Sequence, residues 1–102
     1  MEIKSKLEKY RLYLYFNGEL DECTASKTKV IVDKLIDSQK DLKSVIFDFS
    51  KTSFMDSTGI GMLLGRYKKL KGSGVSSYIS NPSLSVHKIL QISGIYDIMP
   101  KI

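Results

Sequence analysis

Apolar and polar positions alternate along the first part of the chain. Over residues 10–16, leucines and a phenylalanine occupy every second position and tyrosines lie between them, which is the two-residue period of a strand. A weaker alternation over residues 2–7 precedes it. The pattern predicts an antiparallel hairpin, whose second strand ends or bends at Asn17-Gly18.

Two longer segments carry the spacing of amphipathic helices. Apolar residues recur at intervals of three and four over residues 24–38 and again over residues 59–71, which is the period of one helix face. Asp21 or Thr24 is expected to cap the first of these helices. Between the helices, the apolar run Val45–Phe49 predicts a strand buried on both faces, followed by a short polar loop.

The last third of the chain continues with shorter elements. Residues 75–80 predict a strand, and the apolar positions of residues 84–94 predict a third helix. Asn81 is expected to cap this helix, with Pro82 at its first position. Residues 95–99 are expected to add a final short strand.

The predicted order of elements is β-β-α-β-α-β-α-β. Strands that alternate with helices predict an α/β fold, here a mixed, mainly parallel β-sheet with helices packed on it. Right-handed crossovers between parallel strands then limit which face of the sheet the helices cover. The chain has 102 residues and shows no internal repeat or linker, so residues 1–102 are expected to form a single domain.

The composition excludes several classes of protein. A single cysteine, Cys23, excludes an internal disulfide, and with only one histidine, His87, a metal site is not expected. No apolar run approaches the roughly 18 residues that span a bilayer, and the N-terminus lacks the apolar core of a signal peptide. The chain is therefore expected to be cytoplasmic and to have no membrane partner.

The net charge of +5 is compatible with an acidic partner such as nucleic acid. However, the lysines are spread along the chain among 11 acidic residues. The one concentration of positive charge lies in the last turns of the predicted second helix, where cations complement the helix dipole. It consists of Arg66, Lys68, Lys69 and Lys71. We therefore expect a solvated face there and no direct nucleic-acid binding.

Ser57 is the main candidate for chemistry, because it lies where the buried strand leads into the second helix, at the positive end of the helix dipole. Such a hydroxyl can cap the helix, act as a nucleophile or accept a phosphate. A nucleophile needs a nearby base, but His87 lies in a predicted helix, and the segment is not Gly-x-Ser-x-Gly. Catalysis is therefore not expected, and the residues alone leave capping and phosphorylation open.

The segment around Ser57 also carries a family resemblance. The run Ser53–Tyr67 resembles the phosphorylation-site segment of bacterial anti-sigma-factor antagonists, which are STAS domains. Gly18–Asp21 resembles the turn of that family between the first hairpin and the first helix, and Ile92–Ile95 resembles its late helix-to-strand junction. The resemblance extends from about residue 10 to about residue 100, so it implies a STAS fold for nearly the whole chain.

The resemblance implies a partner switch. In this family the unphosphorylated protein binds an anti-sigma factor, which is also an ATP-dependent serine kinase, and a sigma factor is released. Phosphorylation, here at Ser57 with Thr58 as the rival acceptor, ends that complex, and a metal-dependent serine phosphatase reverses it. The chain itself is then neither an enzyme nor a cofactor carrier. The alternative is a STAS scaffold subunit of a signalling or transporter-associated complex, which does not switch.

The resemblance also places the partner-binding surface on one rim of the sheet. The expected residues are Asp21, Ser53, Met55, Asp56, Thr58, Gly59 and Gly61. Asp56 is expected to cap the second helix, to align the hydroxyl, or both. The two glycines are costly inside a helix, and two explanations stay open: close approach of a partner backbone, or tight packing against the neighbouring strand.

One departure from the family pattern concerns the C-terminus. Antagonists of this family usually carry a further helix after the last strand, and this chain stops at Pro100-Lys101-Ile102. The helix is expected to be absent or truncated. One sheet face would then be less covered, which favours weak homodimerisation.

Overall fold

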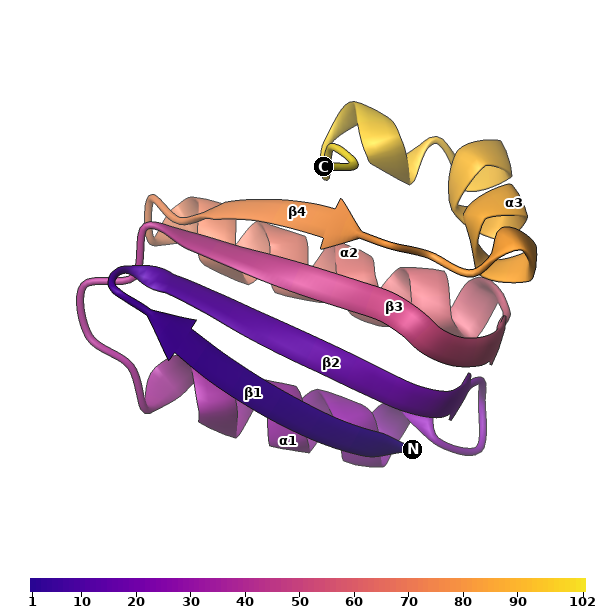
Figure 1. The fold of residues 1–102 in the computed structure, drawn as a ribbon, viewed down its shortest axis with the longest axis horizontal. Helices are drawn as coiled ribbons and strands as arrows, with labels where there is room; N and C mark the ends of the chain where they lie inside the picture. The colour runs from indigo at the N-terminus through magenta and orange to yellow at the C-terminus, as the bar shows by residue number, and fades with distance from the viewer.

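Four strands form one sheet in the order β1-β2-β3-β4 (Figure 1). The computed structural model describes all 102 residues. β1 pairs with β2 in antiparallel fashion, whereas β2, β3 and β4 are mutually parallel neighbours. The strands are β1 Glu2–Glu8, β2 Arg11–Leu20, β3 Ser44–Met55 and β4 Ser76–Ser80. The predicted hairpin and the mixed, mainly parallel sheet are confirmed.

Two helices connect the parallel strands: α1 Ala25–Asp37 leads from β2 to β3, and α2 Ser57–Gly72 leads from β3 to β4. The third helix, α3 Leu84–Ser93, follows β4. Figure 1 shows α1 and α2 behind the sheet, on the same face, and α3 beyond the end of β4. None of these helices has the length and apolar character needed to cross a membrane.

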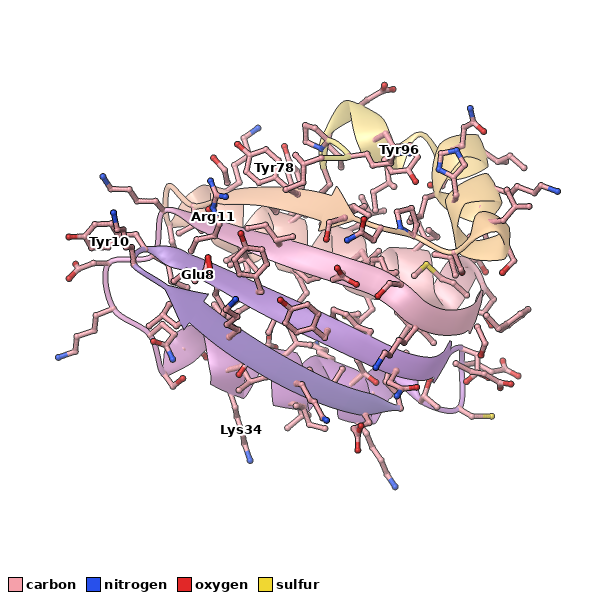
Figure 2. The ribbon with its side chains drawn as sticks, in the orientation of Figure 1. Glu8, Tyr10, Arg11, Lys34, Tyr78 and Tyr96 are labelled. Atoms are coloured by element: carbon pink, nitrogen blue, oxygen red, sulfur yellow. The ribbon has the colours of Figure 1, made fainter.

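The alternation along β2 decides which face of the sheet is buried. Leu12, Leu14 and Phe16 are almost completely buried, and they belong to the core formed with the helices. The tyrosines between them, Tyr13 and Tyr15, are only partly buried. Because side chains alternate across a strand, the tyrosines lie on the face opposite α1 and α2. Figure 2 shows this near face, on which Arg11 and Tyr78 are labelled.

β3 is longer than predicted. The expected polar loop after Phe49 is strand, which continues to Met55. Its backbone pairs with residues 17–20 of β2, and the buried Thr52 hydroxyl donates to the Phe16 carbonyl at 2.9 Å. The polar side chains of this stretch do not give the sequence pattern of a strand. The strand forms because its backbone pairs with the backbone of β2.

The predicted final strand over residues 95–99 is wrong. Ile95–Asp97 forms a 3₁₀ helix, and only Lys101 makes an isolated bridge, to Ile79. Ile95 and Met99 are both buried, and the Met99 amide donates to the Ile95 carbonyl at 2.8 Å. In a strand Asp97 would share the face of these two residues, but it is exposed, so the pattern fits a helical turn.

The predicted start of α3 is also wrong. Ser83 precedes the first helical residue, Leu84, so Pro82 lies outside the helix. Asn81 is not its cap, because it has a left-handed backbone with φ +49°. The side-chain amide of Asn81 instead donates to Asp48 Oδ2 at 3.1 Å. Asn81 therefore fixes the end of β4 to β3.

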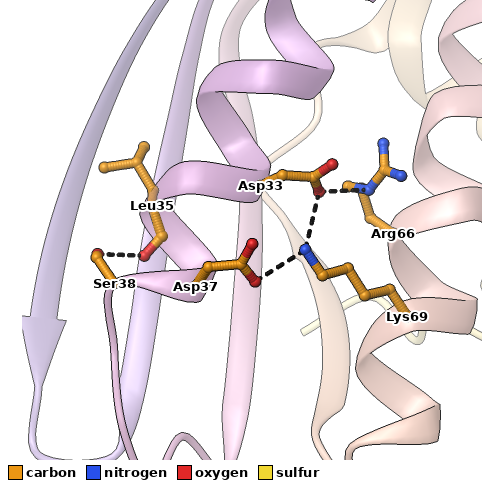
Figure 3. A network of polar contacts seen from close by, with 6 residues as sticks. All are labelled: Asp33, Leu35, Asp37, Ser38, Arg66 and Lys69. Carbon is orange, nitrogen blue, oxygen red and sulfur yellow. Dashed lines mark hydrogen bonds and ion pairs between the residues drawn. The ribbon is translucent and has the colours of Figure 1, made fainter.

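The predicted solvated face at the end of α2 is wrong for Arg66 and Lys69. Arg66 is buried, and its Nε lies 2.9 Å from Asp33 Oδ1 on α1 (Figure 3). Lys69 Nζ lies 2.8 Å from Asp37 Oδ1 and 3.6 Å from Asp33 Oδ1. These ion pairs hold the two helices together over the sheet. Lys68 is exposed, as predicted.

Asp48 is a buried carboxylate within the apolar part of β3. It accepts hydrogen bonds from the Ser50 amide at 2.9 Å, the Ser80 hydroxyl at 3.0 Å and the Asn81 amide group at 3.1 Å. Burial alone would raise the pKa of Asp48, but the hydrogen bonds from Ser50, Asn81 and Ser80 outweigh it and hold that pKa below its ordinary value.

The lowered pKa of Asp48 predicts a pH dependence of stability. The contribution of the ionised carboxylate is fully present above the pKa of an unfolded aspartate, about 3.9, and is lost as pH falls through the lower pKa of the folded state. Asp48→Asn should destabilise the protein by about 1 kcal/mol at pH 7. Thermal melts from pH 2 to pH 7 should show that the variant approaches the parent at the acid end. A difference independent of pH would contradict this assignment.

Candidate functional site

The predicted site residues gather at the rim where β2 and β3 end. Leu20 pairs with Met55 at the last position of the β2–β3 ladder, and the Asp56 amide donates to the Leu20 carbonyl at 3.3 Å. The loop after β2, which begins at Asp21, therefore lies beside the start of α2. This rim is at the right of Figure 1, and carboxyl ends of parallel strands are common positions for binding sites.

Asp56 caps α2. Its backbone is extended, and its Oδ1 accepts hydrogen bonds from the Thr58 amide at 2.9 Å and the Gly59 amide at 3.2 Å. Ser57 is the first helical residue, and both Ser57 and Thr58 are exposed. Because the Asp56 side chain satisfies the first helical amides, capping does not account for the Ser57 hydroxyl.

Asp21 shapes the loop before α1. Its Oδ1 accepts from the Cys23 amide at 2.9 Å and the Thr24 amide at 3.1 Å. Thr24 occupies the cap position of α1 without a side-chain capping bond, and its hydroxyl donates instead to the Glu19 carbonyl at 2.9 Å. Asp21 is partly exposed. It thus holds the turn by one carboxylate oxygen and stands on the same rim as Ser57.

Gly59 and Gly61, the two glycines of the predicted partner-binding surface, are glycine for different reasons. A Cβ built on Gly59 would lie 2.8 Å from Met55 Cγ and 2.9 Å from the Leu20 carbonyl oxygen, and Gly59 is buried. Gly59 therefore serves packing, and it offers no surface to a partner. A Cβ on Gly61 would meet nothing within 4 Å, and Gly61 is exposed, so its open surface remains a candidate for a close partner approach.

Met55 is not a surface residue, contrary to the prediction. It is 4% exposed and belongs to the core, whereas its neighbour Phe54 is 49% exposed. Ser53 is exposed, as required of a rim residue. The sequence predicts a loop over residues 50–55 and so does not single out Phe54. In the extended β3, the two-residue period puts residues 54 and 55 on opposite faces.

Next to the hydroxyl pair, α1 and α2 form a shallow open groove. Thr58, Gly61 and Met62 line it from α2, and Ala25, Ser26 and Lys29 line it from α1. Thr58 thus faces the neighbouring helix. Ser57 does not line this groove.

Comparison with known proteins gives a consistent picture. The STAS domain family model matches residues 3–102. An anti-sigma F factor antagonist from Paenibacillus polymyxa is 30% identical over 102 residues, covering 98% of this chain and 86% of the relative.

Solved structures agree with this match. The anti-sigma factor antagonist SpoIIAA in its unphosphorylated form superposes with a TM-score of 0.80 at 26% identity, over 99% of this chain and 88% of that protein. The Bacillus cell fate determinant SpoIIAA in the phosphorylated form superposes with a TM-score of 0.72 at 25% identity, over 99% of this chain and 91% of that protein.

Proposed function

The chain belongs to the STAS domain family, with anti-sigma-factor antagonists as relatives, and we propose that it is a partner switch controlled by phosphate on Ser57. The unphosphorylated form binds an anti-sigma factor that is also an ATP-dependent serine kinase, and a sigma factor is thereby released. Phosphorylation of Ser57 ends the complex, and a metal-dependent serine phosphatase restores it. ATP and magnesium belong to the kinase, for which this cytoplasmic chain is partner and substrate.

The observation that carries the proposal is the position of Ser57. Its side chain is exposed in the first turn of α2, and the neighbouring Asp56 supplies the helix cap. The hydroxyl is therefore accessible to a kinase. That SpoIIAA structures are known in an unphosphorylated and a phosphorylated form supports phosphorylation of this chain.

The physics of the proposed switch is local. A phosphate adds about −1.5 to −2 charges and three acceptor oxygens. At a helix N-terminus this charge is tolerated, so the fold has no reason to change. A partner packed closely around Ser57 meets an added charge and volume in its interface, and the complex weakens by repulsion and steric exclusion.

The proposal is tested with the purified anti-sigma factor kinase of the host organism. The two proteins should form a complex on size-exclusion chromatography, which ATP and Mg²⁺ should dissolve. Mass spectrometry should then find one phosphate, on Ser57. Phosphate on Thr58 alone would refute the site, and neither binding nor labelling with any anti-sigma kinase of the host would refute the function.

Substitutions that change the charge or the volume of rim residues should show where the anti-sigma factor binds. Asp21→Asn keeps the oxygen that holds the turn but removes the charge, and Gly61→Leu adds bulk where the chain leaves open space. If the partner covers the rim, each should weaken binding by more than about 1 kcal/mol, tenfold being 1.4 kcal/mol. Isothermal titration calorimetry with the anti-sigma factor measures both.

The matched control is Lys34→Glu, because Lys34 is exposed in the last turn of α1 and projects into solvent at the lower edge of Figure 2, away from the rim. It should change affinity little. Lys69 is unsuitable as a control because it pairs with Asp37. Lost binding in Lys34→Glu with retained binding in both rim variants would place the interface on the helical face.

A further inference from the structure

Two large apolar side chains near the rim are exposed without a partner in the fold. Phe54, the last residue but one of β3, is 49% exposed, and Leu84, the first residue of α3, is 71% exposed. Neither contributes to the buried core. Single exposed apolar residues are ordinary, so their meaning depends on whether they lie together.

Hydrogen bonds bring these two residues to the same corner of the molecule. The Ser83 hydroxyl donates to the Thr52 carbonyl at 2.7 Å, and the Ser85 hydroxyl donates to the Ser53 carbonyl at 3.4 Å. The residues on both sides of Leu84 are thus tied to the two residues that precede Phe54. Phe54 and Leu84 therefore lie near each other where β3 meets α3, and we refer to them together as the apolar pair.

The residues that flank this pair in the chain are uncharged, and the cross-strand partner of Phe54 on β2 is the exposed Glu19. The residues next to it are Ser53, Met55, Ser83 and Ser85, in a chain of which 26% is charged. Aromatic residues such as Phe54 are enriched in protein–protein interfaces relative to the rest of the surface. Small serines beside two larger apolar groups also leave those groups protruding, available to enter pockets of a partner.

We propose that Phe54 and Leu84 anchor the anti-sigma factor kinase, extending its docking surface from the Ser57 rim across β3 to α3. This inference rests on the proposed function. Phe54 lies three residues before Ser57, within about 11 Å at full extension. An interface of standard size buries roughly 800 Å² on each partner, equivalent to a disc of about 16 Å radius. Phe54 therefore lies within the radius of an interface of this size centred on Ser57.

The test measures binding and phosphorylation by the same host kinase with Phe54→Ser and Leu84→Ser. Ile92→Ser is the matched control, because Ile92 lies on the same helix and is even more exposed, at 86%, but at the other end. Phe54→Ser should weaken binding about ten- to a hundredfold and Leu84→Ser about tenfold. Ile92→Ser should change it less than about twofold.

The kinetics separate this anchor from the phosphorylation site itself. Both variants should raise the KM for phosphorylation and leave kcat nearly unchanged, and at saturation the phosphate should still be on Ser57. Thermal melts verify folding; Leu84→Ser at an exposed position should melt with the parent, so it keeps the test valid if Phe54→Ser unfolds.

If Leu84→Ser binds the kinase as tightly as the parent, or if Ile92→Ser loses as much affinity as Leu84→Ser, the proposed anchor is wrong. Neither result would contradict the proposed switch at Ser57. If the parent chain forms a dimer, and Leu84→Ser dissociates that dimer without changing the affinity for the kinase, the apolar pair binds a second copy of this chain and the proposed anchor is wrong. If the parent chain neither binds nor is labelled, the proposed function fails and the anchor with it.

Discussion

Replacing Ser57 with alanine is expected to abolish phosphate incorporation by the anti-sigma factor kinase. The hydroxyl is the acceptor, and Asp56, not Ser57, holds the start of α2. The substitution removes one exposed oxygen, so affinity for the kinase should stay within about twofold of the parent. Labelling with ATP followed by mass spectrometry, and calorimetry without ATP, measure the two effects.

Thr58→Ala is the matched control, because Thr58 is the neighbouring exposed hydroxyl. It should be labelled like the parent. Full labelling of Ser57→Ala together with loss of labelling in Thr58→Ala would move the acceptor by one residue, into the groove between α1 and α2.

Ser57→Asp shows whether the negative charge acts locally. An anion at the first turn of a helix is worth about 0.3–1 kcal/mol in the favourable direction, so the variant should melt within a few degrees of the parent. Its affinity for the kinase should nevertheless fall by more than tenfold, about 1.4 kcal/mol. A large drop in melting temperature would mean that the switch works by unfolding.

The largest expected effect on stability is that of Gly59→Ala. Its new Cβ would meet the Leu20 carbonyl oxygen at 2.9 Å and Met55 Cγ at 2.8 Å. The methionine can move, but the carbonyl belongs to the β2 backbone. Overpacking of this kind costs about 1–3 kcal/mol, more than the roughly 1 kcal/mol that alanine gains over glycine in a helix. Chemical denaturation measures the difference.

Gly61→Ala is the control two residues further along the same helix. Its Cβ meets nothing within 4 Å, so the helix gains up to about 1 kcal/mol without a clash. The two alanines should therefore shift stability in opposite directions. Equal destabilisation would mean that both glycines are packed, and Gly61 would no longer be a candidate for partner contact.

The sequence alone determined the elements whose signals are local. The alternation over residues 10–16 predicted that the leucines and Phe16 share one face of β2 and the tyrosines the other, because the side chains of a strand alternate between its faces. The spacings over residues 24–38 and 59–71 predicted α1 and α2 to within two residues at each end. The position of Ser57 at the start of α2 and the capping role of Asp56 could also be read from the sequence, since a cap is made by neighbours in the chain.

Tertiary structure decided every feature that depends on a residue distant in the sequence. The end of β3 is polar and becomes a strand only because β2 offers its backbone, which then turns Met55 inward and Phe54 outward. Gly59 and Gly61 look alike in the sequence, and only the Leu20 carbonyl distinguishes them. Arg66 is buried because Asp33 of another helix pairs with its charge. A buried polar or charged group needs a partner, and local sequence does not reveal which distant residue supplies it.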